Sequence, residues 1–187
     1  MTVSDPLVGV LMGSDSDLPV MRQAIDVLEA LGVPSEVAVL SAHRSPDRAA
    51  AYGREAAGRG LKVIIAGAGV AAHLAGVLAA HTALPVIGVP VKAGPLQGLD
   101  ALLSTVQMPH GVPVAAVAVN GAKNAGILAA QIIGAGDPEV RARVERYKAG
   151  LGTEADAKNA RLQALGIEKY LRERSLTDSW KDAAPND

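Results

Sequence analysis

The fold is decided by residues 7–20, which read LVGVLMGSDSDLPV. The segment starts with a continuous apolar run, as expected for a short strand that is buried on both faces of a sheet. Gly13 to Asp17 then form a polar turn. The apolar spacing that follows, with Met21, Ile25 and Leu28 on one stripe, predicts a helix. These residues therefore predict one strand–turn–helix unit.

The same unit recurs four more times along the chain. Five repeats of strand then helix indicate a parallel sheet with right-handed crossovers and helices on both faces. This doubly wound α/β layout is either flavodoxin-like or Rossmann-like, and such sheets bind ligands at the carboxyl ends of their strands. The further strands are expected at residues 37–40, 61–66, 85–91 and 112–119, and the helices that follow them at 45–60, 70–80, 99–107 and 121–133, the last capped by Asn120.

Charge is distributed unevenly along the 187 residues, which include no cysteine. Residues 1–135 carry eight Lys and Arg and nine Asp and Glu, whereas residues 136–187 carry ten of each kind. Low charge with high hydrophobicity excludes disorder in the first part, and the lack of cysteine excludes a disulfide scaffold. We therefore expect a domain at 1–135 whose surface is largely buried between subunits.

Two classes of partner are disfavoured by composition. The net charge is −1 without a basic block, and Tyr52 is the only aromatic residue before position 136, so we expect no nucleic acid to bind. Residues 63–91 lack Asp, Glu, Lys and Arg, but they include histidines, glycines and prolines and change their period. This run predicts a buried strand, helix and strand rather than a membrane span. We expect a cytoplasmic protein.

Residues 136–187 predict a helical extension. A helix is expected to start at Asp137-Pro138, and a second helix is expected at about 155–172. Both are charged and amphipathic, and they are too few to form a core of their own. We expect them to pack either on the main domain or on a neighbouring subunit.

Polar side chains cluster where the predicted strands end. After the first strand, Ser14 and Ser16 supply hydroxyl donors beside a helix N-terminus, which suits a phosphate, and Asp17 suits sugar hydroxyls next to it. The alternative is an ordinary helix cap, because Ser and Asp are the usual capping residues. Further polar residues follow the fourth and fifth strands, namely Lys92, Gln97, Asn120, Lys123 and Asn124.

The loop after the second strand carries Ser41, His43 and Arg44. Arg44 offers a permanently charged donor for phosphate, and His43 exchanges a proton near neutral pH. In the alternative, Arg44 pairs with Asp47 and His43 merely ends the strand. The adjacency of His43 and Arg44 favours a functional role.

The remaining histidines give weaker signals. His73 lies among Ala and Leu in a predicted helix, where a satisfied, partly buried histidine is the default. The four histidines lack metal-ligand spacing, so we expect no metal. No Ser lies in a G-x-S-x-G elbow, which argues against a hydrolase triad. The residues alone therefore predict binding of a small phosphorylated ligand with proton transfer by histidine.

Seven segments together resemble one known family. They read MGSDSD at 12–17, SAHRSPD at 41–47, IIAGAG at 64–69, AAHL at 71–74, LPVIGVPV at 84–91, LLSTVQMP at 102–109 and NAGILAAQ at 124–131. The resemblance is to the N5-carboxyaminoimidazole ribonucleotide mutases of de novo purine synthesis, the catalytic subunit of phosphoribosylaminoimidazole carboxylase. It covers about residues 7–135 and implies a flavodoxin-like three-layer sandwich with about five strands and extra C-terminal helices.

The resemblance also implies a reaction and a site. The carboxylate on N5 of the imidazole ribonucleotide moves to C4 of the ring by decarboxylation and recarboxylation, without ATP, metal, biotin or redox cofactor. His43 is implied as the general acid–base. The implied substrate-binding residues are Ser14 and Arg44 at the phosphate, Asp17 at the ribose, Ser41 and His73 at the base and carboxylate, and also Ser16, Ala42, Gly69, Ala71 and Leu74.

The resemblance further implies an assembly of eight subunits whose C-terminal helices reach over their neighbours. A transient contact with the ATP-dependent synthase that makes the unstable carbamate fits the same reaction. One departure lies on the base side, where the family usually has Gly-Gly-Ala-Ala-His-Leu-Pro-Gly-Met and this chain has Val70, Ala75 and Val77. Two alternatives stay open. One is the direct CO2-dependent carboxylase class, which has Lys where Arg44 stands, and the other is a non-catalytic module that binds a phosphorylated ligand.

Overall fold

Five strands form one parallel sheet in the computed structural model, which describes residues 5–178. The sheet has the order β2-β1-β3-β4-β5, which is the flavodoxin-like order, so the predicted fold class is confirmed. The strands are β1 (Val8–Met12), β2 (Ser35–Val39), β3 (Val63–Gly69), β4 (Val86–Val91) and β5 (Ala115–Ala116).

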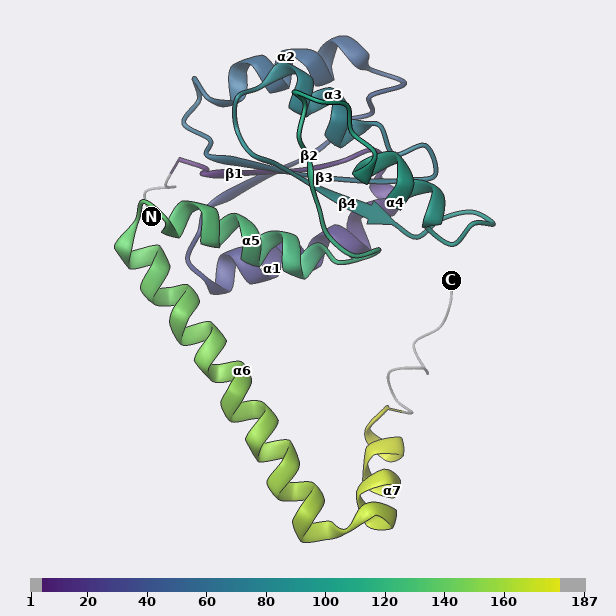
Figure 1. Cartoon of the computed structure of the whole chain (residues 1–187), viewed down its shortest axis with the longest axis vertical. Coiled ribbons are helices and arrows are strands. Elements are labelled where there is room, and N and C mark those ends of the chain that lie inside the picture. Colours follow the sequence, from purple (N-terminus) through teal and green to yellow (C-terminus); the bar gives the residue numbers. More distant parts are fainter. Residues whose placement is uncertain (1–4, 179–187) are drawn as a thin grey trace. The chain divides into compact units, whose positions relative to one another are not determined.

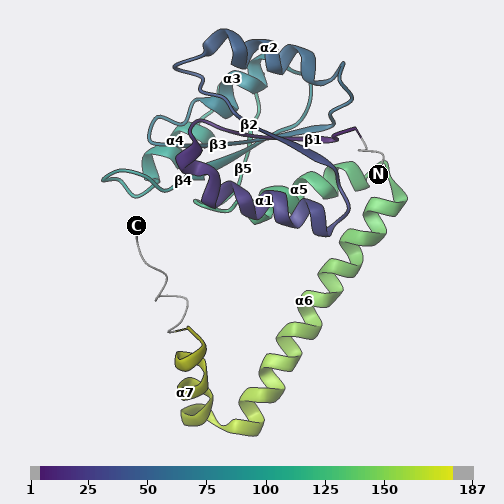
Figure 2. The ribbon, with the colours of Figure 1, turned by 180° about the vertical axis from the view of Figure 1, so that it is seen from behind.

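Helices cover both faces of the sheet and complete the three layers (Figures 1 and 2). One face carries α1 (Leu18–Ala30), which follows a short 3-10 turn at Asp15–Asp17, and α5 (Ala122–Gly134). The other face carries α2 (Pro46–Ala56) and α3 (Leu74–His81). The short helix α4 (Leu99–Val106) packs beside β4 and β5.

The inner strands explain the long stretch without charge. β1 and β4 are buried along their whole length, and β3 is buried from Val63 to Gly67. Residues 63–91 thus supply two inner strands and the helix α3 that packs on them. Among the described residues, no helix combines the length and the apolar character needed to cross a bilayer.

The fifth strand is shorter than the sequence predicts. A strand over 112–119 was expected, but only Ala115–Ala116 pairs regularly with β4, at the exposed edge of the sheet. Pro113 and Pro90 both lack an N–H group, so the hydrogen-bond ladder of this edge is interrupted on both strands. Asn120 is also not the cap of α5, because Gly121 takes that position and the Oδ1 atom of Asn120 accepts a hydrogen bond from the Lys92 N–H at 2.8 Å.

The sequence predicts the boundary between the two C-terminal helices at the wrong position. The helix α6 runs without interruption from Pro138 to Leu165, and α7 covers Ile167–Asp178. Gly166, with φ of +69°, separates them in a left-handed conformation that favours glycine. The part of the predicted extension after residue 178 lies outside the described residues.

The chain divides into two compact units, of which the first ends at Val144 and the second begins at Glu145. Within the first unit, Val140 and Val144 are buried and the Nε atom of Arg143 donates to the Leu31 carbonyl oxygen at 2.6 Å. Within the second unit, every described side chain is at least partly exposed. The ion pair between Arg161 and Glu173, at 2.8 Å, joins α6 to α7 there.

A polar cluster ties β2 to α2. The Tyr52 hydroxyl donates to the Glu36 carboxylate at 2.6 Å, and the Arg59 guanidinium donates to both oxygens of that carboxylate and stacks over the Tyr52 ring. Burial raises the pKa of Glu36, but the hydrogen bonds from Arg59 and Tyr52 outweigh burial and hold this pKa below its ordinary value. The ionised form of Glu36 therefore contributes to the stability of the fold.

Replacing Tyr52 by Phe keeps the ring but removes its hydrogen bond to Glu36. We predict that the free energy of unfolding falls by roughly 1 kcal/mol at pH 7, as for one hydrogen bond to a partly buried group. The pKa of Glu36 is lowered in the folded protein. The difference in free energy of unfolding between the two proteins is therefore present above the ordinary pKa of 4.5, and it shrinks as pH falls through the pKa of the folded protein. Denaturant unfolding at several pH values measures it.

Tyr170→Phe is the matched control, since no hydrogen bond of the Tyr170 hydroxyl is found among the described residues. Equal stability of Tyr52→Phe and the unchanged protein at pH 7 would contradict the role given to this cluster.

Candidate active site

The loops that follow β1 and β2 leave the sheet at one level, and β3 beside them runs two residues further, to Gly69. Met12, the last residue of β1, is in register with Val39 at the end of β2 and with Gly67 in β3. The Gly13 N–H donates to the Gly67 carbonyl oxygen at 3.0 Å, which holds the first loop against β3. The chain changes its direction across the sheet between β1 and β3, and doubly wound sheets bind their ligands at this point.

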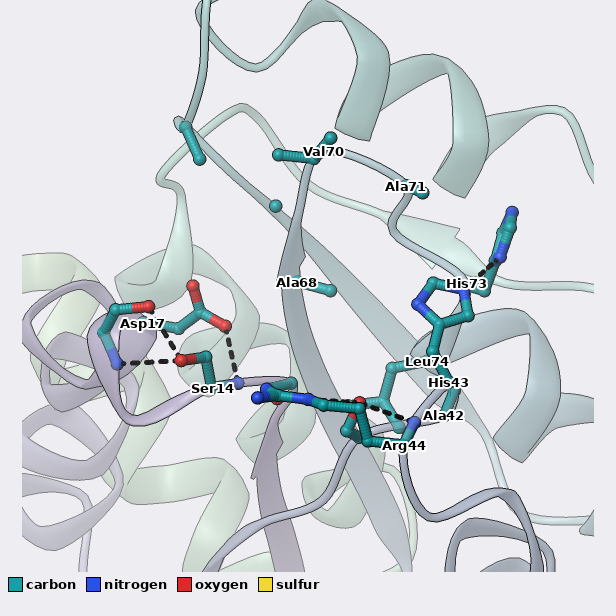
Figure 3. Close-up of a pocket in the computed structure, with 15 residues that line it drawn as sticks. Ser14, Asp17, Ala42, His43, Arg44, Ala68, Val70, Ala71, His73 and Leu74 are labelled. Carbon is teal, nitrogen blue, oxygen red and sulfur yellow. Dashed lines mark hydrogen bonds between the residues drawn. The ribbon is translucent and has the colours of Figure 1, made fainter.

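A cavity of about 390 Å³ opens between these loops (Figure 3). All eleven residues that the resemblance implies for the site line it, namely Ser14, Ser16, Asp17, Ser41, Ala42, His43, Arg44, Gly69, Ala71, His73 and Leu74. The further lining residues are Gly13, Ala68, Val70 and Ala93. The predicted residues thus lie together, and the role of each one stays a prediction.

The loop after β1 is a helix cap whose polar atoms also face the cavity. The Ser14 hydroxyl accepts a hydrogen bond from the Ser16 N–H at 3.3 Å, and the Asp17 carboxylate accepts one from the Ser14 N–H at 3.1 Å. The Ser16 hydroxyl lies 2.9 Å from the Ser14 hydroxyl. The capping alternative is therefore correct, and it is compatible with a ligand because the same hydroxyls line the cavity.

Asp17 is the one acidic side chain in the wall of the cavity, and only 7% of the residue is exposed. Burial raises the pKa of Asp17, the hydrogen bond from the Ser14 N–H opposes this rise, and the negative charge of Asp15 adds to it. An acidic acceptor held in a partly dry position is suited to hydroxyl donors of a ligand.

Arg44 links the loop after β2 to the loop after β1. One terminal nitrogen of its guanidinium donates to the Gly13 carbonyl oxygen at 3.2 Å. The Ser41 hydroxyl accepts from the Arg44 backbone N–H at 3.2 Å and from its Nε atom at 3.4 Å. Within residues 5–178, the alternative ion pair with Asp47 is not observed. The guanidinium is thus held at the cavity without a carboxylate to neutralise it.

His43 and His73 lie side by side at the opposite side of the cavity from Asp17 (Figure 3). The Nε2 atom of His43 is 2.6 Å from the Nδ1 atom of His73, and the rings meet edge to face with their centroids 4.8 Å apart. At this distance a hydrogen bond joins the two ring nitrogens, and the tautomers of the two rings decide which nitrogen donates. His73 is therefore an exposed residue at the N-terminus of α3 that contacts His43, and not the partly buried helix residue expected by default.

Five polar residues that follow the last two strands do not line the cavity, and Ala93, which the sequence does not predict at the site, does. Lys92, Gln97, Asn120, Lys123 and Asn124 follow β4 and β5 but do not line the cavity. Ala93 joins from the loop after β4, and a Cβ atom on Gly69 would lie 2.9 Å from the Ala93 Cβ, so the loops after β3 and β4 meet closely here. No local pattern in the sequence singles out Ala93, because its place at the cavity depends on how β3 and β4 pair. In the described part of the chain, no group of three or more His, Asp or Glu could hold a metal ion.

A family model described as AIR carboxylase matches residues 7–154, which include every residue of the cavity. The chain belongs to the AIR carboxylase family. The match runs through all five strands of the sheet and extends into α6.

Individual relatives agree with the assignment to this family. The chain is 56% identical to the N5-carboxyaminoimidazole ribonucleotide mutase of Thermotoga maritima, over 90% of this chain and 99% of that protein. It is 53% identical to the phosphoribosylaminoimidazole carboxylase of Saccharomyces cerevisiae, over 90% of this chain but 30% of the longer yeast protein. The structure of PurE from Treponema denticola superposes with a TM-score of 0.76 at 28% identity, covering 84% of this chain and 98% of that one.

Asp17→Asn should stabilise this AIR carboxylase family member at neutral pH. The pKa of Asp17 is raised in the folded protein, so its stabilising contribution is complete below the ordinary value of 3.8 and is lost as pH rises through the folded pKa. Asn still accepts the Ser14 N–H and carries no charge to bury. Denaturant unfolding should show a gain in the free energy of unfolding at pH 7 that disappears toward pH 4.

Asp47→Asn removes the same charge from the exposed first turn of α2 and serves as the control, which should give no such gain. A lower stability of Asp17→Asn than of the unchanged protein at pH 7 would contradict the account of this carboxyl group.

Proposed function

We propose that this chain is an N5-carboxyaminoimidazole ribonucleotide mutase of purine biosynthesis, an intramolecular transferase. The observation that carries the proposal is the His43–His73 pair, with 2.6 Å between ring nitrogens, in one cavity with the Arg44 guanidinium. Such a cavity offers a proton at one end and a phosphate site at the other. The relative from Thermotoga maritima carries the name of this enzyme.

The phosphate and ribose ends of the substrate fit the two loops that Arg44 joins. Arg44, Ser14 and Ser16 supply a guanidinium and two hydroxyls for the phosphate oxygens. The buried carboxylate of Asp17 lies next to these donors and accepts hydrogen bonds from ribose hydroxyls. In this arrangement the Asp17 carboxylate lies beside the phosphate site but binds the ribose, whereas the guanidinium and the two hydroxyls bind the phosphate.

The chemistry requires one group that gives and then takes a proton. The bond between N5 and the carboxyl carbon breaks, its electron pair stays on nitrogen, and that nitrogen takes a proton from His43. C4 of the ring then attacks the released CO2, and the neutral His43 removes the proton from C4. Protons balance over the cycle, and a histidine suits both directions near pH 7. His73 orients the ring of His43 through the hydrogen bond between their ring nitrogens.

The base side of the cavity is formed by small groups. Gly69, Ala71 and Ala42 let the backbone approach a flat imidazole, while Leu74 is buried beneath it and Ser41 adds a hydroxyl. The reaction requires that water be kept away from the carbamate and from CO2. The proposed reaction needs no ATP, metal, biotin or redox cofactor.

The direct CO2-dependent carboxylase is the second candidate, and it uses the same phosphate site. The name of the yeast relative, phosphoribosylaminoimidazole carboxylase, does not separate the two candidates, because the mutase family is the catalytic subunit of the enzyme with that name. Arg44 favours the mutase, because the carboxylase class has Lys in its place.

We further propose a homo-octamer in the cytoplasm. Four residues on and just before α4 present exposed apolar side chains at helical spacing, namely Leu96, Leu99, Leu103 and Val106. An apolar strip of this kind is typical of a subunit interface. We also propose that the helical extension, described to residue 178, packs on the core or on a neighbouring subunit.

A transient contact with the ATP-dependent synthase that makes the carbamate completes the proposal. The carbamate is unstable in water, so direct delivery would limit its loss. In the yeast relative a further region of chain accompanies the matched one, which supports a functional neighbour.

His43→Asn should abolish turnover and retain binding. Asn keeps a polar side chain but cannot exchange a proton near pH 7, so we predict a fall in kcat of roughly 10²–10⁴-fold or more. Ultraviolet absorbance follows N5-carboxyaminoimidazole ribonucleotide in one assay and aminoimidazole ribonucleotide plus bicarbonate in another. Fast turnover of the first substrate alone supports the mutase.

His110→Asn, outside the cavity, is the matched control and should leave kcat unchanged. Turnover of neither substrate by the unchanged protein would refute the enzymatic proposal, and an active His43→Asn variant would refute the role of His43.

The proposed octamer predicts a particle of eight times the 19.0 kDa chain mass at micromolar concentration. Leu103→Lys should shift this mass toward smaller species, because it places a charge in the apolar strip of α4. Sedimentation velocity measures both. A monomer of the unchanged protein at this concentration would contradict the assembly.

A further inference from the structure

The hydroxyl group of Ser45 does not cap the helix that it precedes. Ser45 occupies the N-cap position of α2, where a serine side chain ordinarily accepts a hydrogen bond from a backbone N–H of the first turn. Among the residues that the structure describes, no N–H group of this turn bonds to the Ser45 hydroxyl. The hydroxyl instead donates to the Ser41 carbonyl oxygen, four residues back, at 2.9 Å. The side chain therefore fixes the loop before α2 and not the helix itself.

Two hydrogen bonds from Ser45 close the loop that follows β2. The Ser45 backbone N–H donates to the same Ser41 carbonyl oxygen at 2.9 Å, so this one oxygen accepts twice. The Ser41 hydroxyl accepts in turn from the Arg44 N–H at 3.2 Å and from the Arg44 Nε atom at 3.4 Å. Ser41 is thus held through its carbonyl group by Ser45 and through its hydroxyl by Arg44, which makes residues 41–45 one closed turn.

This closed turn carries the two side chains on which the proposed reaction depends most. From it, the His43 ring reaches His73, with 2.6 Å between ring nitrogens, and the Arg44 guanidinium reaches the Gly13 carbonyl oxygen at 3.2 Å (Figure 3). Ser45 itself is partly buried and is not among the residues that line the cavity. A change at Ser45 therefore alters the site only through its neighbours in the turn.

The stability of α2 does not explain the orientation of the Ser45 hydroxyl. A capping serine stabilises its helix by satisfying a backbone N–H that has no partner within the helix, and this contribution is absent here. The backbone N–H of Ser45 already closes the turn, so the hydroxyl adds a second bond to a carbonyl group that has one. Local preferences are overridden in this way chiefly at functional sites.

We propose that Ser45 is a positioning residue, which holds His43 and Arg44 in place through its side-chain bond to the Ser41 carbonyl oxygen. This inference rests on the proposed function. Proton transfer requires the His43 ring within hydrogen-bond reach of the reacting atom, and a displacement of about 1 Å can lower a rate roughly 10²-fold. Without the hydroxyl, one bond remains where two held the turn. The turn then relaxes, which lowers kcat through His43 and raises KM through Arg44.

The test compares Ser45→Ala with Ser45→Thr, which keeps the hydroxyl, and with Ser104→Ala as the matched control. The Ser104 hydroxyl is also partly buried and also donates four residues back, to the Asp100 carbonyl oxygen at 2.8 Å. It lies in α4 and does not line the cavity. Ultraviolet absorbance with N5-carboxyaminoimidazole ribonucleotide gives kcat and KM, and denaturant unfolding gives the stability of each protein.

We expect Ser45→Ala to lower kcat and to raise KM, with a combined fall in kcat/KM between roughly 10-fold and roughly 10²-fold. Ser45→Thr should restore both constants. Ser104→Ala should lose as much stability as Ser45→Ala, because each removes one bond of the same kind, and should keep both constants. If Ser45→Ala does not fold, Ser45→Gly removes the same hydroxyl at an N-cap position, where glycine is well tolerated.

Unchanged kcat and KM in the variant without the hydroxyl would overturn the inference. Failure of Ser45→Thr to restore them would do the same, as would an equal loss of activity in Ser104→Ala, because the effect would then follow from stability alone. Failure of the proposed function is distinct, since the unchanged protein would then turn over no substrate.

Discussion

The site depends on the register of the three strands around β1. Met12 is level with Val39 on one side and with Gly67 on the other, so the loops after β1 and β2 leave the sheet at one height and the loop after β3 leaves two residues further along. Because the strands are parallel, their carboxyl ends share one edge, and the change of direction beside β1 spreads the loops apart. Segments from 13–17, 41–44 and 68–74 thereby surround one cavity.

The polar groups of the free protein satisfy one another. Ser14 and Asp17 form a capping box, Arg44 donates to the Gly13 carbonyl oxygen, and His43 contacts His73. These bonds place each group before a ligand arrives, which lowers the entropic cost of ordering them on binding. A ligand exchanges some of these bonds for its own, so the same contacts serve both folding and function.

The sequence predicts correctly those strands and helices that local patterns of residues determine. The continuous apolar run before Gly13 and the N-cap, proline and acid at Ser45 to Asp47 predict elements whose ends the structure shifts by only a few residues. The residues at 14–17 and 41–44 could be grouped because they directly follow predicted strands, whereas Gly69, Ala71, His73 and Leu74 are predicted through the resemblance to the family. The features that the sequence does not predict depend on contacts between residues far apart in the sequence, or on backbone angles. The short β5, the bond from Lys92 to Asn120 and the positive φ of Val70 are set by neighbouring segments that no local pattern reveals.

The orientation of the ligand is the central claim, with the phosphate at Arg44 and the imidazole at the histidine pair. The most direct measurement is a crystal structure of the protein with 4-carboxy-5-aminoimidazole ribonucleotide bound. The account predicts phosphate oxygens within hydrogen-bond distance of Ser14 and Arg44, ribose hydroxyls at Asp17, and the ring carbon C4 beside His43. A nucleotide bound in the reverse orientation, with its phosphate at His43 and His73, would contradict it.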